Sequence, residues 1–181
     1  PQGVGGMVLL NTLAPSNVAT VGDITSLTST YRNYLITFEN IVPATSAGVV
    51  FQLQVATTGT AFISGGYVSW VNHVIGGAGA NTSSTTVIQL NGSLATTNLG
   101  NGTTYGLSGF VRVFNPAGTA TRKYFIGEVA WLNGTTSQTG SFGYGLPNGY
   151  YDGNSNAITG MQFSMSAGNI QTGTIKIYGM A

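Results

Sequence analysis

The sequence predicts an all-β protein, an antiparallel β-sandwich of jelly-roll type. Short runs in which apolar and polar residues alternate recur along the 181-residue chain, and glycine, proline and asparagine separate them. No stretch of about ten residues or more combines helical periodicity with good helix formers. The runs number about nine or ten and show no repeat of fixed period, which favours a sandwich over a propeller or solenoid.

The clearest of these runs is 49–56, in which Val49, Phe51, Leu53 and Val55 form an inner face and Val50, Gln52 and Gln54 an outer one. The run 34–41 places Tyr34, Ile36 and Phe38 on one face, and Pro43 ends it because proline lacks a backbone donor. In chain order, we expect strands at 7–10, 18–24, 34–41, 49–56, 85–90, 105–114, 122–132 and 137–142, shorter pieces within 61–74, and loops at 76–84, 91–104 and 143–156.

The last stretch, 158–180, contains two alternating runs around the small residues Ala167, Gly168 and Asn169. The apolar positions are Met161, Phe163 and Met165 in the first run and Ile175 and Ile177 in the second. Alternation on both sides of a Gly-Asn turn is typical of a β-hairpin. We therefore expect this stretch to close the fold as a hairpin.

The runs 105–114 and 122–132 are apolar on both faces. In the first run, Phe110 is on one face and Val111 on the other; in the second, Ile126 is on one face and Phe125 on the other. Antiparallel sheets commonly leave one face in water. These strands therefore require a second apolar partner, and another subunit is the simplest one.

The composition excludes several functions. Charged residues make up only 5% of the chain, against roughly 25% in ordinary soluble proteins. The local basic cluster, Arg122-Lys123 with Arg112 nearby, is too small to neutralise several phosphates, so nucleic-acid binding is not expected. There is no cysteine, and no apolar run approaches the ~20 residues of a membrane span. We expect one domain, 1–181, without membrane insertion.

Catalytic groups are scarce. The carboxylates are Asp23, Glu39, Glu128 and Asp152. A glycosidase needs two of them about 5 to 10 Å apart, and Glu128 with Asp152 is a candidate pair, but we expect each carboxylate to be a solvated or capping residue. His73 is the sole histidine, and no serine stands in a G-x-S-x-G elbow, so we expect His73 to be a polar surface residue in a loop. We assign no catalytic residue and expect no enzyme.

The segment 152–156 begins like the D-x-N-x-N of a calcium loop. The glycine expected next is Ala157, and Phe163 stands where the closing glutamate belongs. This mismatch excludes an EF-hand, while a looser site of oxygen ligands stays open. No metal or cofactor is assigned.

The best candidate for a binding site is the Tyr- and Asn-rich segment 143–156. Ring faces that stack on C–H patches, beside amide and carboxylate groups that bridge hydroxyls, are what sugar binding requires. Trp70 and His73, in another expected loop, join this site if the fold brings the two loops together. The candidate residues are Asn148, Tyr150, Tyr151, Asp152, Asn154, Trp70 and His73. The alternative is that the tyrosines plug one end of the sandwich.

Two segments resemble the C-terminal domains of bacteriophage tail-fibre and tail-tip receptor-binding proteins. The first is TYRNYLITFENIVPA, with the pattern Y-x-x-Y-L-I-x-F-x-N-I-x-P, and the second ends in G-x-I-x-I-Y-G. The residues that carry the likeness are Tyr31, Tyr34, Leu35, Ile36, Phe38, Ile41 and Pro43, and later Phe163, Gly168, Ile170, Gly173, Ile175, Ile177, Tyr178 and Gly179. The resemblance implies a jelly-roll-like, usually homotrimeric domain that presents loops to a host-surface glycan, and it carries over no binding residue.

These observations lead to three hypotheses. The first is a non-enzymatic adhesion module of a virion tail fibre or tail tip, assembled in the host cytoplasm, that binds a bacterial surface polysaccharide or lipopolysaccharide. The second is a structural decoration or trimerisation domain without a ligand. The third is a polysaccharide depolymerase, which the shortage of carboxylates disfavours.

Overall fold

The computed structural model describes residues 6–45, 49–92, 99–133 and 142–180, which form two antiparallel sheets and no helix within these ranges. The strands are β1 (Met7–Leu13), β2 (Thr20–Asp23), β3 (Asn33–Pro43), β4 (Phe51–Ala56), β5 (Tyr67–Ile75), β6 (Ala78–Ser84), β7 (Ile88–Gln89), β8 (Leu107–Phe114), β9 (Lys123–Leu132), β10 (Phe142–Tyr151), β11 (Gly160–Met165) and β12 (Ile170–Met180). The predicted class, an all-β sandwich, is confirmed.

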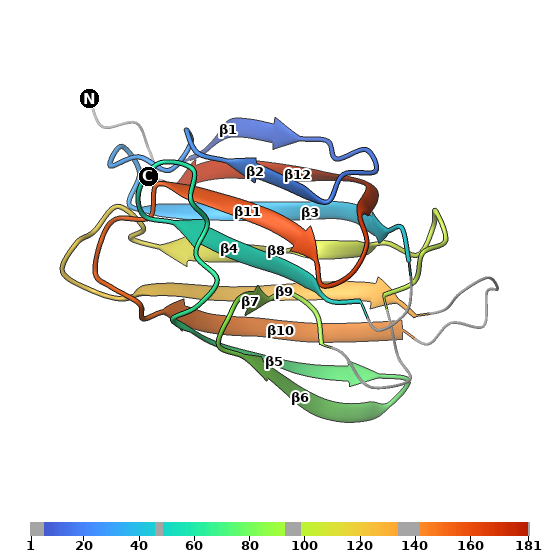
Figure 1. The fold of residues 1–181 in the computed structure, drawn as a ribbon. Helices are drawn as coiled ribbons and strands as arrows, with labels where there is room; N and C mark the ends of the chain where they lie inside the picture. The colour runs from blue at the N-terminus through green and yellow to red at the C-terminus, as the bar shows by residue number, and fades with distance from the viewer. Residues whose placement is uncertain (1–5, 46–48, 93–98, 134–141, 181) are drawn as a thin grey trace.

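The larger sheet has the order β1-β12-β3-β8-β9-β10-β5-β6, and the smaller sheet has the order β2-β11-β4-β7 (Figure 1). Each strand of the smaller sheet has neighbours along the chain that belong to the larger sheet. The layer β1-β12-β3-β8 over the layer β2-β11-β4-β7 is the eight-stranded arrangement of a jelly roll. The other four strands widen the larger sheet on the β8 side.

The core lies between the sheets and is filled by alternate residues of each strand. Phe38 of β3 packs against Phe51 of β4 and Phe163 of β11, with ring centroids 5.2 and 5.7 Å apart. Burial of each such side chain contributes about 1.5–3 kcal/mol. The inner face predicted for 49–56 is confirmed, and in 34–41 the buried set is Tyr34, Ile36 and Phe38.

The hairpin predicted for 158–180 is wrong. β11 pairs with β2 and β4, whereas β12 pairs with β1 and β3 in the other sheet. The turn around Gly168, whose φ is 70°, therefore carries the chain across the core. Alternation indicates which face of a strand is apolar but not which strand it pairs with. Phe163 and Ile177 are both buried in one core, from opposite sheets.

Two segments predicted as glycine-rich loops are strands. Residues 78–84 form the edge strand β6, which pairs with β5 along its whole length. Residues 142–151 form β10, between β9 and β5, so only the residues after Tyr151 are loop. A Cβ on Gly143 would overlap the Trp131 ring, so this glycine serves close packing and not a turn. Of the strand predicted at 137–142, Phe142 begins β10 and the rest lies outside the described residues.

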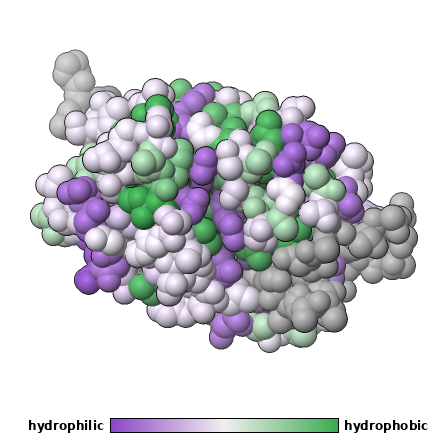
Figure 2. Space-filling model, viewed as in Figure 1, coloured by the Kyte–Doolittle hydropathy of each residue, from purple (hydrophilic) through white to green (hydrophobic). Residues whose placement is uncertain are grey.

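The two large faces of the sandwich differ in composition. On the side of the smaller sheet, hydrophobic side chains are scattered among polar and neutral ones (Figure 2). The opposite face belongs to the larger sheet, and we call it the outer face. Its apolar side chains include Ile126, which is 55% exposed, and the half-buried Phe110. The second apolar set predicted for β8 and β9 does point outward, where it lies beside the exposed Arg112 and Glu128. Nowhere in the described part of the chain is there a long apolar helix able to cross a bilayer.

Candidate functional site

Three of the predicted site residues share the outer face. Asn148 and Tyr150 alternate outward on β10, and Trp70 of β5 lies directly opposite Asn148 in the strand register. Trp70 is 46% exposed. On the other side of β10, Tyr150 pairs with Tyr124 of β9, and their ring centroids are 5.9 Å apart. Residues directly opposite in a sheet touch, so these side chains form one continuous surface.

Two predicted site residues point into the core instead. Tyr151 is 2% exposed and packs against Tyr67, with ring centroids 5.3 Å apart. His73 is 3% exposed and lies on β5, against Gly92, so the expectation of a surface loop residue is wrong. Successive residues of a strand point to opposite faces, and each of these follows or precedes outward residues. The plugging role that we considered for the tyrosines therefore describes Tyr151 but not Tyr150.

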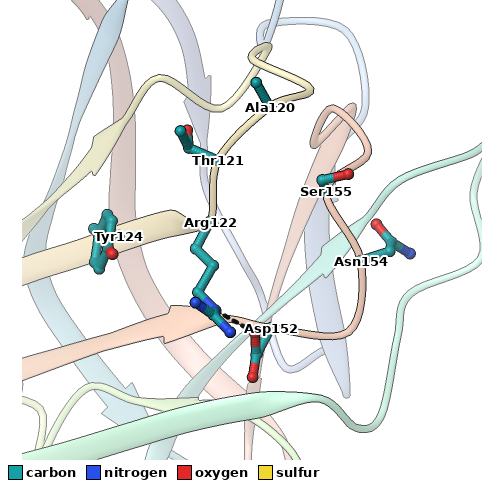
Figure 3. Close-up of a pocket in the computed structure, with 7 residues that line it drawn as sticks. All are labelled: Ala120, Thr121, Arg122, Tyr124, Asp152, Asn154 and Ser155. Atoms are coloured by element: carbon teal, nitrogen blue, oxygen red, sulfur yellow. Dashed lines mark hydrogen bonds and ion pairs between the residues drawn. The ribbon is translucent and has the colours of Figure 1, made fainter.

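A polar pocket of about 470 Å³ opens where β9 begins and β10 ends (Figure 3). We call it the end pocket. One wall is the segment that leads into β9, and the other is the loop that follows β10. Its lining residues are Ala120, Thr121, Arg122, Tyr124, Asp152, Asn154 and Ser155.

An ion pair joins the two walls of the end pocket. Nε of Arg122 donates a hydrogen bond to Oδ1 of Asp152, and the two side chains point toward one another in Figure 3. The carboxylate raises the pKa of Arg122, first through this hydrogen bond and then through its charge. The guanidinium also lies over the Tyr150 ring, 5.5 Å from its centroid. The other guanidinium N–H groups have no partner among the described residues, so they are available to a ligand.

Lys123 fixes the position of both walls from inside the protein. Its side chain is 0% exposed, and Nζ donates to the backbone oxygens of Thr121 at 2.6 Å and Ser155 at 3.2 Å. No carboxylate among the described residues pairs with it, and burial lowers its pKa. Because both acceptors belong to residues that line the end pocket, this buried cation holds the pocket in shape.

Asn154 has a supporting role in the loop after β10. Its amide Nδ2 donates to the Tyr151 hydroxyl at 3.3 Å, and its Oδ1 accepts from the backbone N–H of Asn156 at 3.0 Å. The side chain thus connects the exposed loop to the buried tyrosine. Of the groups around the pocket, Arg122, Asp152 and the half-exposed Tyr124 are best placed to meet a ligand.

The carboxylates do not form a glycosidase pair. Asp152 pairs with Arg122, which directly precedes β9. Glu128 lies six residues further along the chain, about 20 Å from Arg122 at the usual strand rise. That exceeds the ~5–10 Å that glycoside hydrolysis requires. Glu128 instead lies near Tyr144, and the pKa of Tyr144 is raised by partial burial and by this carboxylate. Within the described ranges there is no group of three or more His, Cys, Asp or Glu side chains able to hold a metal ion.

Sequence reasoning missed half of the end pocket. Arg122 was noted only as part of a small basic cluster, and Tyr124 was not proposed as a site residue. Their signal lies in the strand register, since residues 122–124 of β9 face residues 150–152 across the sheet. That register is visible only once 142–151 is recognised as a strand.

The chain was also compared with known proteins. No family model matches it, and no curated protein matches its sequence.

Proposed function

We propose that this protein is a non-enzymatic adhesion module that binds a polysaccharide or lipopolysaccharide on a bacterial surface. The observation that carries the proposal is the end pocket, where an Arg122–Asp152 pair lies beside the rings of Tyr124 and Tyr150. Planar charged groups hydrogen-bond vicinal hydroxyls, while ring faces pack on the C–H side of a sugar. The pocket is large enough for one sugar unit and open to solvent on the outer face.

The charge distribution supports a neutral or weakly charged ligand. Arg122 and Asp152 compensate one another at the mouth of the end pocket, and the whole chain has a net charge of only +1. Long-range electrostatic attraction therefore contributes little to binding. We expect the affinity for the glycan to change little between low and physiological ionic strength.

The proposal includes a place for the protein in a virion. The resemblance of the framework residues to tail-fibre and tail-tip domains supports a position at the end of a bacteriophage tail fibre, in a homotrimer. The exposed apolar side chains of the outer face, such as Ile126, supply a surface that a second and third copy would bury. A decoration or trimerisation domain without a ligand is the competing function, and the binding experiment separates the two.

The test is binding to an array of purified bacterial surface polysaccharides, followed by titration of the best ligand. Tyr150→Ala and Arg122→Leu are each expected to weaken binding roughly tenfold or more, because each removes a stacking or charged hydrogen-bonding group. Lys176→Ala is the matched control, since it breaks the exposed Lys176–Glu39 pair elsewhere on the larger sheet. Unchanged binding by both Tyr150→Ala and Arg122→Leu, or no binding by the folded protein, would overturn the proposal in favour of a structural module.

A further inference from the structure

The outer face has a second hollow, at the junction of β10, β5 and β6. We call it the side groove; its volume is about 400 Å³. Asn72 of β5 and Asn81 of β6 lie opposite one another in the register and are both exposed. The ring of Tyr144 and the side chain of Leu146, both outward on β10, form the other wall. Two adjacent amides beside an aromatic ring repeat the chemistry of the end pocket without its charges.

Gly79 of β6 lines the side groove without adding a side chain to it. Gly79 lies opposite Val74 in the register, so a side chain at this position would project onto the outer face. An added Cβ would meet no atom within 4 Å, and Gly79 is not among the residues with positive φ. The backbone and the packing therefore do not require glycine here. Because glycine has no side chain, the space at this position in the groove stays open.

A strip of suitable side chains connects the two hollows. Tyr150, Asn148, Leu146 and Tyr144 alternate outward along β10, and Trp70 lies beside Asn148. Tyr150 and Tyr144 are six positions apart, which is about 20 Å along a strand. Asn148 Nδ2 donates to the Leu146 carbonyl at 3.1 Å, which leaves its Oδ1 free to accept from a hydroxyl.

The strip is uncharged. All outward residues of β10 and β5 between the end pocket and the side groove are neutral, and they comprise aromatic rings, amides and aliphatic side chains. The neighbouring carboxylate of Glu128 on β9, beside Tyr144, repels a polyanion. A polyanion would find no row of cations there. This surface is complementary to an uncharged, polyhydroxylated chain that presents C–H patches and hydroxyls in turn.

We propose that the side groove is a second sugar subsite, and that the ligand is an extended, uncharged polysaccharide chain lying along β10 from the end pocket to the side groove. This inference rests on the proposed function and names its ligand class. Recognition then requires a run of several sugar units within or at the end of a chain, and one terminal sugar does not suffice. Two weak subsites on one ligand reinforce one another through effective concentration.

The test uses size-fractionated fragments, from two to about ten sugar units, of the bacterial polysaccharide selected on the array. Calorimetric titration should show affinity rising about 100-fold with fragment length until the fragment spans both hollows, then levelling off. Gly79→Val places a branched side chain in the open space of the side groove and should reduce the affinity for long fragments toward that for short ones. Ala78→Val, one residue earlier and on the other face of β6, should leave the affinities for long and for short fragments unchanged.

The outcomes separate this inference from the function on which it rests. If short and long fragments bind equally, or if Gly79→Val binds long fragments like the unaltered protein, the extended chain is wrong while the adhesion module stands. If no polysaccharide binds at all, both proposals fail. If Gly79→Val changes the oligomeric state, as measured by light scattering, another copy of the chain covers the groove and the subsite is wrong.

Discussion

Asp23 lies at the end of β2 and organises the turn that follows. Its Oδ1 accepts hydrogen bonds from the backbone N–H groups of Thr25 at 2.9 Å and Ser26 at 2.7 Å. Its Oδ2 accepts from the Ser26 hydroxyl at 2.8 Å and from the side-chain amide of Asn11 on β1. Burial alone would raise the pKa of Asp23, but these hydrogen bonds outweigh it and hold the pKa below its usual value.

The lowered pKa of Asp23 predicts how stability depends on pH. The ionised carboxylate contributes stability that is fully present above its unfolded pKa of about 3.9 and is lost as the pH falls through the folded pKa. Asp23→Asn should therefore lower the free energy of unfolding by about 1–3 kcal/mol at pH 7 and by less at pH 3. Urea denaturation at both pH values measures this.

Glu39→Gln is the control for Asp23, because its carboxylate lies in an exposed pair with Lys176 and contributes little. The prediction fails if Asp23→Asn destabilises the protein equally at pH 7 and pH 3.

The strand β10 replaces a predicted loop and determines where the candidate site lies. Its glycines and Pro147 are typical of a loop, and the segment was predicted as one. The backbone nevertheless pairs with β9 on one side and β5 on the other. The missing side chain of Gly143 makes room for Trp131, which fills the core beneath the strand.

Gly143→Ala therefore tests whether this strand depends on close packing. The added methyl group would overlap the buried Trp131 ring, so the core must shift, at a cost of about 1–3 kcal/mol in the free energy of unfolding. Gly79→Ala is the matched control in β6, where the methyl group enters open space. Equal stability of the two variants in denaturant titrations would contradict this account of β10.

The outer face holds the surface proposed for contact between copies and the surface proposed for glycan binding, side by side. Ile126 of β9 lies between Arg112 of β8 and Asn148 of β10 in the register. Apolar side chains toward β8 and the edge strand β1 are candidates for contact between copies. The rings and amides on β10 and β5 form the strip proposed for the glycan. A homotrimer must therefore leave the β10 side of β9 open.

Light scattering should show a homotrimer at micromolar concentration. Phe110→Glu combined with Ile126→Glu should dissociate it into monomers with an unchanged far-ultraviolet circular dichroism spectrum, because both side chains lie on the surface and carry no fold-determining contact in the core. Trp70→Ser, on the far side of the same face, should leave the trimer intact. A stable monomer formed by the unaltered protein would refute the trimer.

Local patterns in the sequence predict the fold class and the inner face of 49–56. Alternation is a local property, and one residue of shift would expose every apolar side chain of a strand, so Phe51 could be placed inward from the sequence alone. Phe125 could not, because its strand is apolar on both faces. The sequence also identified Tyr150, Asn148 and Trp70 as candidates, because their side-chain chemistry suits a sugar regardless of the fold.

Which strands pair, and therefore which residues meet at the candidate site, is visible only in the folded structure. The two arms of 158–180 join different sheets, and a glycine-rich segment becomes the strand β10 because backbone pairing on both sides needs no side chains. That strand turns Tyr151 inward and Tyr150 outward, and brings Asp152 to Arg122, 30 residues earlier in the chain. Partners this far apart along the chain are chosen by the register between strands, which no local pattern of residues specifies.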